Sequence, residues 1–381
     1  MCGVTGLVSL NESTQLVDVE NSIQSLKNRG PDSNGIWISR DRRIIFGHTR
    51  LSIQDTSEFG SQPMISKCSN YVIVYNGEIY NFNRLKDLLR QEKNIQLKSN
   101  SDTELLLESL INLGVSKTCK IIDGMFSFVF LKIKEKKLFL ARDKFGEKPL
   151  YYFINKEKIC FASTLNALKI YLNKLDELDN ESIYYYLRYG FVQSTRSIYK
   201  NVSQVSPSEF IEINTSTLKI ENKVKYWNIN KYLGLKKTNS NSKNLYEVIK
   251  KSVQDRLIGD VDVGCFLSGG IDSSLIASTA SKSINKNLKT FSIGFEEEEY
   301  DESENSLAIS RFIGSDHTAY KISSSELVEL IPNISKSSDQ PFADSSFIPM
   351  LSLCELSSKS VKVCLSGDGA DEMFGGYERY R

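Results

Sequence analysis

Three short stretches of the chain combine residue types that can do chemistry. A cysteine stands at position 2, directly after the initiator methionine. The stretches FLSGGIDSS at 266–274 and LSGDGADEMFGGY at 365–377 each place glycine, serine and aspartate after an apolar run. A thiol is a potential nucleophile, and glycine-rich turns let backbone N–H groups approach an anion. These patterns indicate a covalent step in the first half of the chain and phosphate binding in the second.

A cysteine nucleophile needs a base, and the chain has only two histidines, His48 and His317. Removal of Met1, which the small side chain of Cys2 favours, would provide another base. The exposed α-amino group of Cys2 would have an ordinary pKa of about 8, so that a fraction is neutral at physiological pH. The alternative is that Cys2 is an ordinary small apolar residue, as we expect for most of the other six cysteines. No CxxC pair is present, which disfavours a zinc site, and the odd number disfavours a disulfide framework.

The stretch FLSGGIDSS is the sharpest local signal. Ser268, Gly269 and Gly270 form a predicted turn after a buried strand, and Asp272 and Ser273 open a helix. A helix N-terminus presents unpaired N–H groups and a favourable dipole to an anion. The GK[ST] ending of a Walker loop is missing, and so is a GxGxxG pattern. The alternative is an ordinary strand–turn–helix with Asp and Ser caps.

The stretch LSGDGADEMFGGY repeats this arrangement with more acid. Ser366 and Gly367 follow a predicted strand, and Asp368, Asp371 and Glu372 come next. Carboxylates beside a polyphosphate are unfavourable unless a cation lies between them, so the pattern implies Mg²⁺. The alternative is a glycine-rich acidic loop that caps a helix.

The elements that must position these residues differ between the two halves. Alternating or β-branched apolar runs predict strands at 3–10, 43–53, 71–79, 124–133 and 137–143, and helical spacing predicts helices at 82–91 and 102–114. This mixture suggests stacked sheet and helix layers. We expect a helix at 181–191, a hairpin at 210–227 and a polar linker at 236–244. Predicted helices at 245–258, 273–284, 302–314 and 324–335 then alternate with strands at 262–267, 289–295 and 361–367, which indicates a parallel doubly wound sheet.

Composition excludes several classes of protein. The chain has 381 residues, 40% hydrophobic and 25% charged, with a formal net charge of +1. Nothing in this balance indicates a nucleic-acid or membrane-surface partner. No apolar stretch is long enough to span a bilayer, and no leader pattern precedes Cys2. We expect a cytoplasmic protein.

Further motifs carry a resemblance to known families. RGPDSNGIW, GHTRLSI, YNGEIYNF, SNSDTELLL and ARDKFGEKPLYY resemble the class II glutamine amidotransferase domain. FLSGGIDSS, TFSIGF, QPFADSS and LSGDGADEMFGGY are similar to the synthetase domain of glutamine-hydrolysing asparagine synthetases, whose SGGxDS loop is of the ATP-pyrophosphatase type. The resemblance implies an α+β N-terminal-nucleophile sandwich of αββα layers, followed by an α/β doubly wound parallel-sheet ATP-pyrophosphatase domain. It divides the chain into a glutaminase domain at 2–210, a connecting hairpin and linker at 211–242 and an ATP-binding domain at 243–381.

The resemblance also implies roles for individual residues. The residues it implies for catalysis are Cys2, Asn76, Gly77 and Asp368. Glutamine would be bound by Arg50, Leu51, Ile53, Asn76, Gly77, Glu78 and Asp102. ATP would be bound by Leu267, Ser268, Gly269, Gly270, Asp272, Ser273, Ile293, Ser366 and Gly367, with Mg²⁺ on Asp272 and Asp371. The implied substrates are glutamine, ATP and aspartate, and a homodimer is compatible with the likeness.

Two departures from the family pattern leave alternatives open. Asp368 stands where the family's aspartate-specific members often have Glu, and the chain ends at Arg381, before a helical segment that the family pattern includes. The synthetase domain is therefore expected to be short. The acceptor could be another carboxylate, such as a sugar acid of a surface polysaccharide. A chain that only hydrolyses glutamine, or binds nucleotide as an interaction module, is the alternative from a different class. Lactam-forming relatives are disfavoured because Cys2 is present.

Overall fold

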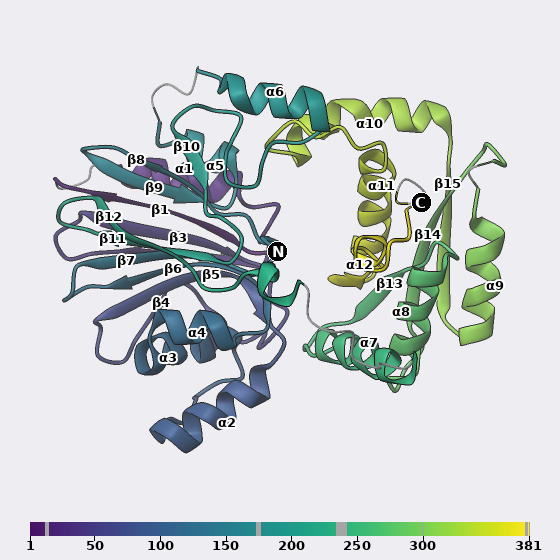
Figure 1. The fold of residues 1–381 in the computed structure, drawn as a ribbon, viewed down its shortest axis with the longest axis horizontal. Coiled ribbons are helices and arrows are strands. Elements are labelled where there is room, and N and C mark those ends of the chain that lie inside the picture. Colours follow the sequence, from purple (N-terminus) through teal and green to yellow (C-terminus); the bar gives the residue numbers. More distant parts are fainter. Residues whose placement is uncertain (12–14, 173–176, 234–241, 300, 378–379, 381) are drawn as a thin grey trace. The chain divides into compact units, whose positions relative to one another are not determined.

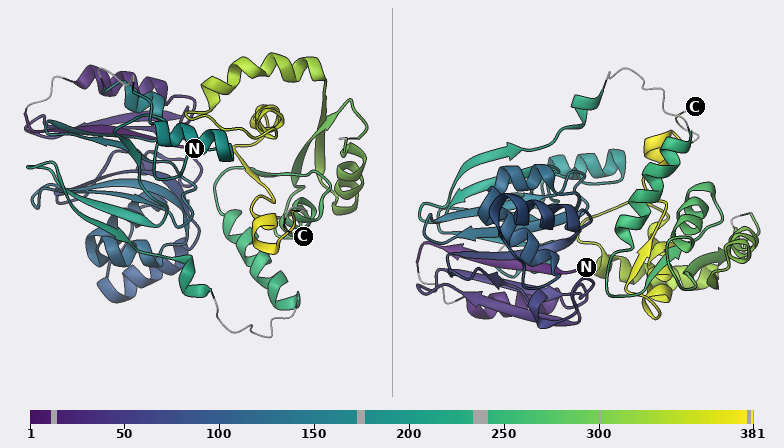
Figure 2. Two further views of the ribbon diagram at one scale, coloured as in Figure 1. Left: turned by 45° about the horizontal axis from the view of Figure 1, so that its top comes forward. Right: turned by 90° about the horizontal axis from the view of Figure 1, so that it is seen from below.

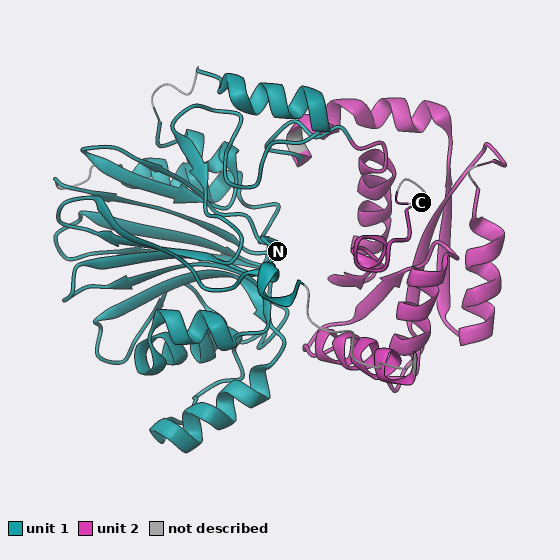
Figure 3. Ribbon diagram, in the orientation of Figure 1, with its two compact units in different colours: residues 1–235, 338–343 teal, residues 236–337, 344–381 magenta. Residues whose placement is uncertain are grey.

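The computed structural model describes residues 1–11, 15–172, 177–233, 242–299, 301–377 and 380. It divides into two compact units, which are described separately (Figure 3). Unit 1 comprises residues 1–235 and 338–343, and unit 2 comprises residues 236–337 and 344–381. Within the described ranges, no helix is long and apolar enough to cross a membrane.

Unit 1 is built on two stacked antiparallel sheets (Figure 1). The first has the order β10 (Val202–Gln204), β8 (Tyr151–Ile154), β9 (Lys158–Ala162), β1 (Gly3–Ser9), β3 (Ile44–Arg50) and β2 (Ser33–Ile38). The second has the order β12 (Lys219–Lys225), β11 (Glu209–Asn214), β7 (Lys137–Arg142), β6 (Gly124–Lys132), β5 (Tyr71–Ile79) and β4 (Met64–Ile65).

The alternation of side chains along each strand explains the layers. On β5, Val72 and Val74 pack into the core between the sheets, whereas Ile73 and Tyr75 pack into a second core beneath helices. The helices of unit 1 are α1 (Leu16–Ser25), α2 (Phe82–Lys93), α3 (Asp102–Leu113), α4 (Val115–Ile121), α5 (Leu165–Lys169) and α6 (Asn180–Tyr189), with short 3₁₀ turns at Glu58–Gly60 and Ile229–Tyr232. α1 and α5 cover the outer face of the first sheet, and α3 and α4 cover that of the second (Figure 2). The predicted αββα sandwich is therefore confirmed.

Unit 2 contains a parallel sheet with the order β15 (Asp316–Ile322), β14 (Lys289–Phe295), β13 (Val263–Phe266) and β16 (Val363–Leu365). Its helices are α7 (Ser242–Arg256), α8 (Ile271–Ser281), α9 (Ser303–Ile313), α10 (Ser324–Ser337), α11 (Phe347–Ser358) and α12 (Ala370–Phe374). The chain runs outward from β13 to β15 and returns to the other side of β13 with β16. The strand order thus reverses between β13 and β16, where ligands bind in open α/β sheets. The predicted doubly wound sheet is confirmed.

The region between the two halves has a more specific arrangement than the sequence indicates. The expected hairpin is β11 and β12, but it is no separate connection, because β11 pairs with β7 throughout its length and completes the second sheet. Most of the expected linker at 236–244 lies outside the described residues. The domain boundaries at 210 and 242 stay predictions.

Candidate active sites

Strand pairing in the first sheet positions Cys2. Gly3 of β1 lies opposite Thr49 of β3, so the register places Cys2 opposite Arg50 and beside Leu51, just beyond the end of β3. The Leu51 backbone N–H points to the Cys2 Sγ at 3.4 Å, and the thiol reaches back to the Leu51 carbonyl at 3.7 Å. The predicted residue Leu51 therefore meets Cys2 through its backbone. Ile53 follows two residues later and is half-buried.

The surroundings of Cys2 favour a neutral thiol beside a neutral amine. Burial raises the pKa of the Cys2 thiol, and the Leu51 N–H opposes this effect. The α-amino group in the structure belongs to Met1, and burial, reinforced by the charges of Arg29 and Lys148, lowers its pKa to about 6. An amine that is neutral at physiological pH can accept a proton from the thiol.

The two histidines serve elsewhere in the structure. His48 is fully buried, its Nε2 lies 3.1 Å from the Tyr75 carbonyl, and burial lowers its pKa to about 3. His317 lies on β15 of unit 2, where its ring nitrogens contact the hydroxyls of Thr290 and Ser292. Neither ring hydrogen bonds to the described Cys2 thiol. A thiol–histidine pair is thus excluded in this arrangement.

A donor without a partner lies on β5. The Asn76 side chain is 1% exposed, and its Nδ2 makes no hydrogen bond within the described part of the chain. A buried amide without an acceptor costs about 1–3 kcal/mol, so this group is poised for an acceptor that a ligand would bring. Gly77 follows it on the strand, and Glu78 shares the face of Asn76 because successive side chains alternate. The predicted pair Asn76 and Gly77 therefore lies near the C-terminal end of β5, directly before Glu78.

Arg50 is held by the loop that follows it. Its guanidinium donates to the carbonyl of Ser57 at 2.7 Å and to that of Asp55. Gly60 makes this possible, since a Cβ there would lie 2.7 Å from the guanidinium carbon. Because both carbonyls fix the orientation of the fork, Arg50 is prepared to bind a carboxylate with its remaining donors.

Two carboxylates lie close to these groups. Asp102 opens α3 and accepts the Tyr75 hydroxyl at 2.9 Å. Burial raises the pKa of Asp102 to about 6, although hydrogen bonds from Tyr75 and two backbone N–H groups oppose the shift. Burial and the Asp102 charge raise the pKa of Glu78 well above its usual range, and Lys148 opposes this. A buried carboxylate pair of this kind favours a cationic ligand, such as an ammonium group.

The candidate site of unit 2 is a loop between β13 and α8. Leu267 is buried in the core and offers only its backbone, whereas Ser268 and Gly270 are exposed. The hydroxyls of Ser268 and Ser273 lie 3.0 Å apart across the turn, and the Gly270 N–H points to the Ser268 hydroxyl at 3.3 Å. Gly269 has φ of +89° and a Cβ there would lie 2.6 Å from Asn305, so both conformation and space require glycine.

The second loop of unit 2 lies against the first. A Cβ on Gly367 would come within 3.0 Å of the Asp272 Cβ and the Ser273 N, so the two loops meet at the reversal point of the sheet. Ser366 donates to Asp368 at 2.8 Å, and Asp371 lies in the first turn of α12. Ile293, on the neighbouring strand β14, packs half-buried beside Phe291. The structure therefore brings all the predicted nucleotide residues to one edge of the sheet.

These residues fit a magnesium ion that a polyphosphate brings with it. Among the described residues, no group of three or more histidine, cysteine or carboxylate side chains could hold a metal. Mg²⁺ usually takes one or two protein carboxylates and completes its shell with phosphate oxygens and water. Asp272 and Asp371 are hard oxygen donors in the first turns of α8 and α12, the helices that follow the two loops, and suit this role.

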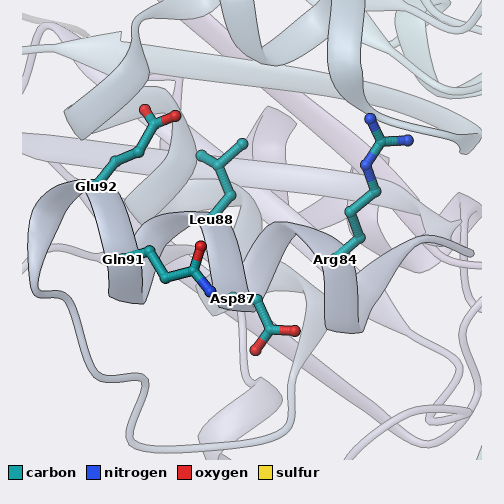
Figure 4. A pocket seen from close by; sticks show the side chains of 5 residues that line it. All are labelled: Arg84, Asp87, Leu88, Gln91 and Glu92. Carbon is teal, nitrogen blue, oxygen red and sulfur yellow. The ribbon is translucent and has the colours of Figure 1, made fainter.

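Sequence reasoning missed several residues of the first site. Arg29, Lys148 and Tyr75 lie in the stretches RGPDSNGIW, ARDKFGEKPLYY and YVIVYNGEI, but nothing in those stretches told which side chains turn inward. Arg29 donates from Nε to the Cys2 carbonyl at 3.1 Å, and both Arg29 Nη2 and Lys148 Nζ approach the Met1 sulfur, Lys148 at 3.2 Å. A pocket elsewhere, lined by Arg84, Asp87, Leu88, Gln91 and Glu92 of α2, contains none of the predicted residues (Figure 4).

Comparison with known proteins agrees with this two-part arrangement. Residues 1–227 match the model of the glutamine amidotransferase domain, and residues 244–381 match that of asparagine synthase. The chain is 35% identical, over its whole length, to asparagine synthetase [glutamine-hydrolyzing] 1 of Bacillus subtilis, of which it spans 60%. It is 33% identical, over 99% of its length, to a putative asparagine synthetase [glutamine-hydrolyzing] of Methanocaldococcus jannaschii, of which it spans 76%. It is 28% identical to amidase chry2 of Gibberella zeae, of which it spans 60%. The chain therefore belongs to the glutamine-hydrolysing asparagine synthetase family.

Proposed function

We propose that the protein is a glutamine-dependent asparagine synthetase. The observation that supports this proposal most is the unpartnered buried amide of Asn76 on β5, in a unit that also contains the Cys2 thiol beside the Leu51 N–H and the Arg50 guanidinium anchored by a carbonyl. The family supports it, because relatives of this chain carry that name. The chain spans 60% of the Bacillus subtilis relative, so the complete reaction is a proposal for this chain.

The first half-reaction takes place at Cys2. The α-amino group that Cys2 exposes once Met1 is removed accepts the thiol proton, and Sγ attacks the side-chain amide carbon of glutamine. The Asn76 Nδ2 and the Gly77 N–H donate to the oxyanion, and Arg50 binds the substrate carboxylate. Asp102 and Glu78 bind its α-ammonium group, whose positive charge offsets the burial of both carboxylates. Ammonia leaves, and water hydrolyses the thioester to glutamate.

The second half-reaction takes place at the edge of the sheet in unit 2. The loop 268–273 and the pair Ser366 and Gly367 hold the phosphates of ATP by backbone N–H groups and hydroxyls. Asp272 and Asp371 would hold Mg²⁺, whose charge would stabilise pyrophosphate as the leaving group. The aspartate side-chain carboxylate attacks the α-phosphate, pyrophosphate leaves, and ammonia then displaces AMP to give asparagine. The role assigned to Asp368 in this proposal is to accept a proton from the attacking ammonia.

A second candidate keeps the chemistry and changes the acceptor. The side chain of Asp368 is shorter than that of glutamate, so its carboxylate extends less far toward a small acceptor. This favours a larger acceptor carboxylate, such as that of a sugar acid. The third candidate is hydrolysis of glutamine alone. Aspartate as the acceptor, a homodimer and a cytoplasmic location stay predictions.

The test is to measure glutamate and pyrophosphate release by the 381-residue chain with ATP, Mg²⁺ and glutamine, with and without aspartate. Aspartate-dependent pyrophosphate together with glutamate supports the asparagine synthetase. Pyrophosphate that appears only with sugar acids supports the second candidate. Glutamate without pyrophosphate for any acceptor leaves only glutaminase activity, and no glutamate at all contradicts the proposal.

A further inference from the structure

The hydrogen bonds around Tyr75 show how the end of β5 is held. The short strand β4 pairs with β5 only at Val72 and Ile73, so in the described part of the chain no strand lies along this edge of β5 beyond Ile73. Tyr75 turns both of its backbone groups to this uncovered edge, because its N–H donates to the Gln62 Oε1 at 2.6 Å and its carbonyl lies 3.1 Å from the His48 Nε2. Side chains thus take the place of a neighbouring strand at Tyr75.

His48 is the donor in its hydrogen bond to Tyr75. A carbonyl can only accept, so the proton of the neutral imidazole lies on Nε2. The ring is neutral at physiological pH, because burial lowers its pKa to about 3. Its Nδ1 has no partner among the described residues, so the bond to Tyr75 orients the ring. His48 lies on β3 of the other sheet and therefore fixes β5 from across the core between the sheets (Figure 1).

The Gly77 N–H points to the same uncovered edge. Backbone groups alternate in direction along a strand, so those of Tyr75 and Gly77 face the same side of β5. The partner strand agrees with this direction. Phe126 lies opposite Gly77 on β6, and its N–H and carbonyl both bond to Asp143, on the side of β6 away from β5. Gly77 and Phe126 are therefore a pair without mutual hydrogen bonds, which leaves the Gly77 N–H directed at the edge.

Asn76 lies between Tyr75 and Gly77 and depends on the same anchor. The Tyr75 carbonyl and the Asn76 N belong to one planar peptide group, so the direction of this carbonyl also sets the orientation of the Asn76 backbone. The Asn76 side chain shares a face of β5 with Val74, which packs in the core between the sheets. Its Nδ2 is the buried donor that no described residue uses. One hydrogen bond from His48 therefore orients the peptide group from which both predicted donors follow.

We propose that His48 is a positioning residue of the glutaminase site, which holds the Tyr75 carbonyl so that Asn76 and Gly77 keep their donors aimed at the oxyanion. The inference rests on the role that the proposed function gives to these two donors. Without the His48 N–H, the Tyr75 carbonyl loses its partner at an edge that no described strand covers, and the peptide group can turn. Oxyanion stabilisation depends on donors that are fixed in advance, so the transition state is weakened more than the bound substrate.

The experiment compares glutamine hydrolysis by the full chain and by three variants. His48→Met removes the donor and fills the space with an apolar side chain, and we expect it to lower kcat about 10-fold and to change KM less than twofold. His48→Gln keeps an amide N–H near the position of Nε2, so its kcat is expected to stay within about threefold of the wild type. The control is Phe46→Leu, which alters packing on the same face of β3 without removing a hydrogen bond. Its kcat is expected to stay within about twofold.

Alkylation by iodoacetamide separates the oxyanion donors from the nucleophile. The Cys2 Sγ forms a bond to carbon as iodide leaves, and this displacement places no negative charge on a carbonyl oxygen. The alkylation rate at Cys2 in His48→Met is therefore expected to stay within about twofold of the wild type. The inference is overturned by an unchanged kcat in His48→Met, by an equal loss in His48→Gln or Phe46→Leu, or by an alkylation rate that falls as far as kcat. In each of these cases glutamate release by the wild type still supports the proposed function.

If the wild-type chain releases no glutamate, the proposed function is contradicted, and amide hydrogen exchange still tests whether His48 holds β5. Peptides that cover residues 75–79 are expected to exchange at least about fivefold faster in His48→Met than in Phe46→Leu, because the end of the strand opens more often without its anchor. Equal exchange rates in these two variants overturn the inference.

Discussion

The two candidate sites differ in how deeply their polar groups are buried and in whether side chains or backbone groups form them. In unit 1 the site consists of buried side chains, with Asn76 at 1% and Asp102 at 6% exposure. Burial raises the pKa of Asp102 and leaves the Asn76 amide without an acceptor among the described residues. In unit 2 the site consists of backbone turns and side chains that face water, such as Ser268 and Asp368. The first site is organised without a ligand, whereas the second, if it binds nucleotide as proposed, would balance its charges only with a polyphosphate and a cation.

The largest expected effect follows from the separateness of these sites. Cys2→Ala removes the nucleophile and is expected to lower glutamine hydrolysis by more than about 1,000-fold, while any reaction with added ammonia continues. Glutamate release and ammonia-driven pyrophosphate release measure the two activities. Cys68→Ala is the control, because Cys68 is an exposed thiol beside Ser66. Equal loss of both activities in Cys2→Ala would contradict two independent sites.

The next prediction concerns the organised character of the first site. Asn76→Ala removes a single donor, and the loss of one oxyanion donor costs about 100- to 1,000-fold in kcat. The KM for glutamine is expected to change little, since Arg50 and Asp102 remain. Because Asn76 has no partner in the described structure, its removal is not expected to lower thermal stability. A higher KM with unchanged kcat would show that Asn76 binds the ground state instead.

The dependence of the second site on cations is tested at Asp272. Asp272→Asn is expected to lower ATP-dependent pyrophosphate release about 100-fold at limiting Mg²⁺ and less at high Mg²⁺, because a metal ligand is weakened. Glutaminase activity is expected to be unchanged. Asp316→Asn is the control, since Asp316 is exposed at the start of β15, at the opposite end of the parallel strands from the loops. A loss independent of Mg²⁺ would argue against a metal role.

Local periodicity was enough to predict most elements and the doubly wound sheet, whereas the αββα order of the first half was implied by the resemblance to class II glutamine amidotransferases. The predicted strand at 71–79 is β5 without a change of boundary, and the predicted helices at 82–91 and 102–114 are α2 and α3. The structure also contains elements that were not predicted, among them β8, β9, α11, α1 and β15. In α1 the valines and the isoleucine carry strand-like character, and β15 is an edge strand with an exposed, mixed sequence.

Site residues could be predicted only where residue type and spacing alone indicate a chemical role. Cys2 and the glycine-rich loops stand out in the sequence, and the structure brings each set together. Arg29 does not, because its importance comes from its burial and from its hydrogen bond to the Cys2 carbonyl. The orphaned amide of Asn76 likewise appears only when packing denies it an acceptor.

The smallest effect concerns the cost of organising unit 1. Burial raises the pKa of Asp102 from 3.8 to about 6, so the folded state binds a proton more tightly than the unfolded state does. The stabilising contribution is complete below pH 4 and is lost as the pH rises through 6, which amounts to about 3 kcal/mol. Asp102→Asn is expected to flatten this dependence in the ligand-free protein and to make unit 1 more stable than the wild type above pH 6, although it raises the KM for glutamine.

Both tryptophans, Trp37 and Trp227, lie in unit 1, so fluorescence during urea unfolding reports this unit. The exposed Asp87→Asn should leave the profile unchanged. A wild-type profile that is flat between pH 4 and 7 would mean that the carboxylate is not penalised by burial, and the contrast between an organised site and an open one would lose its energetic basis.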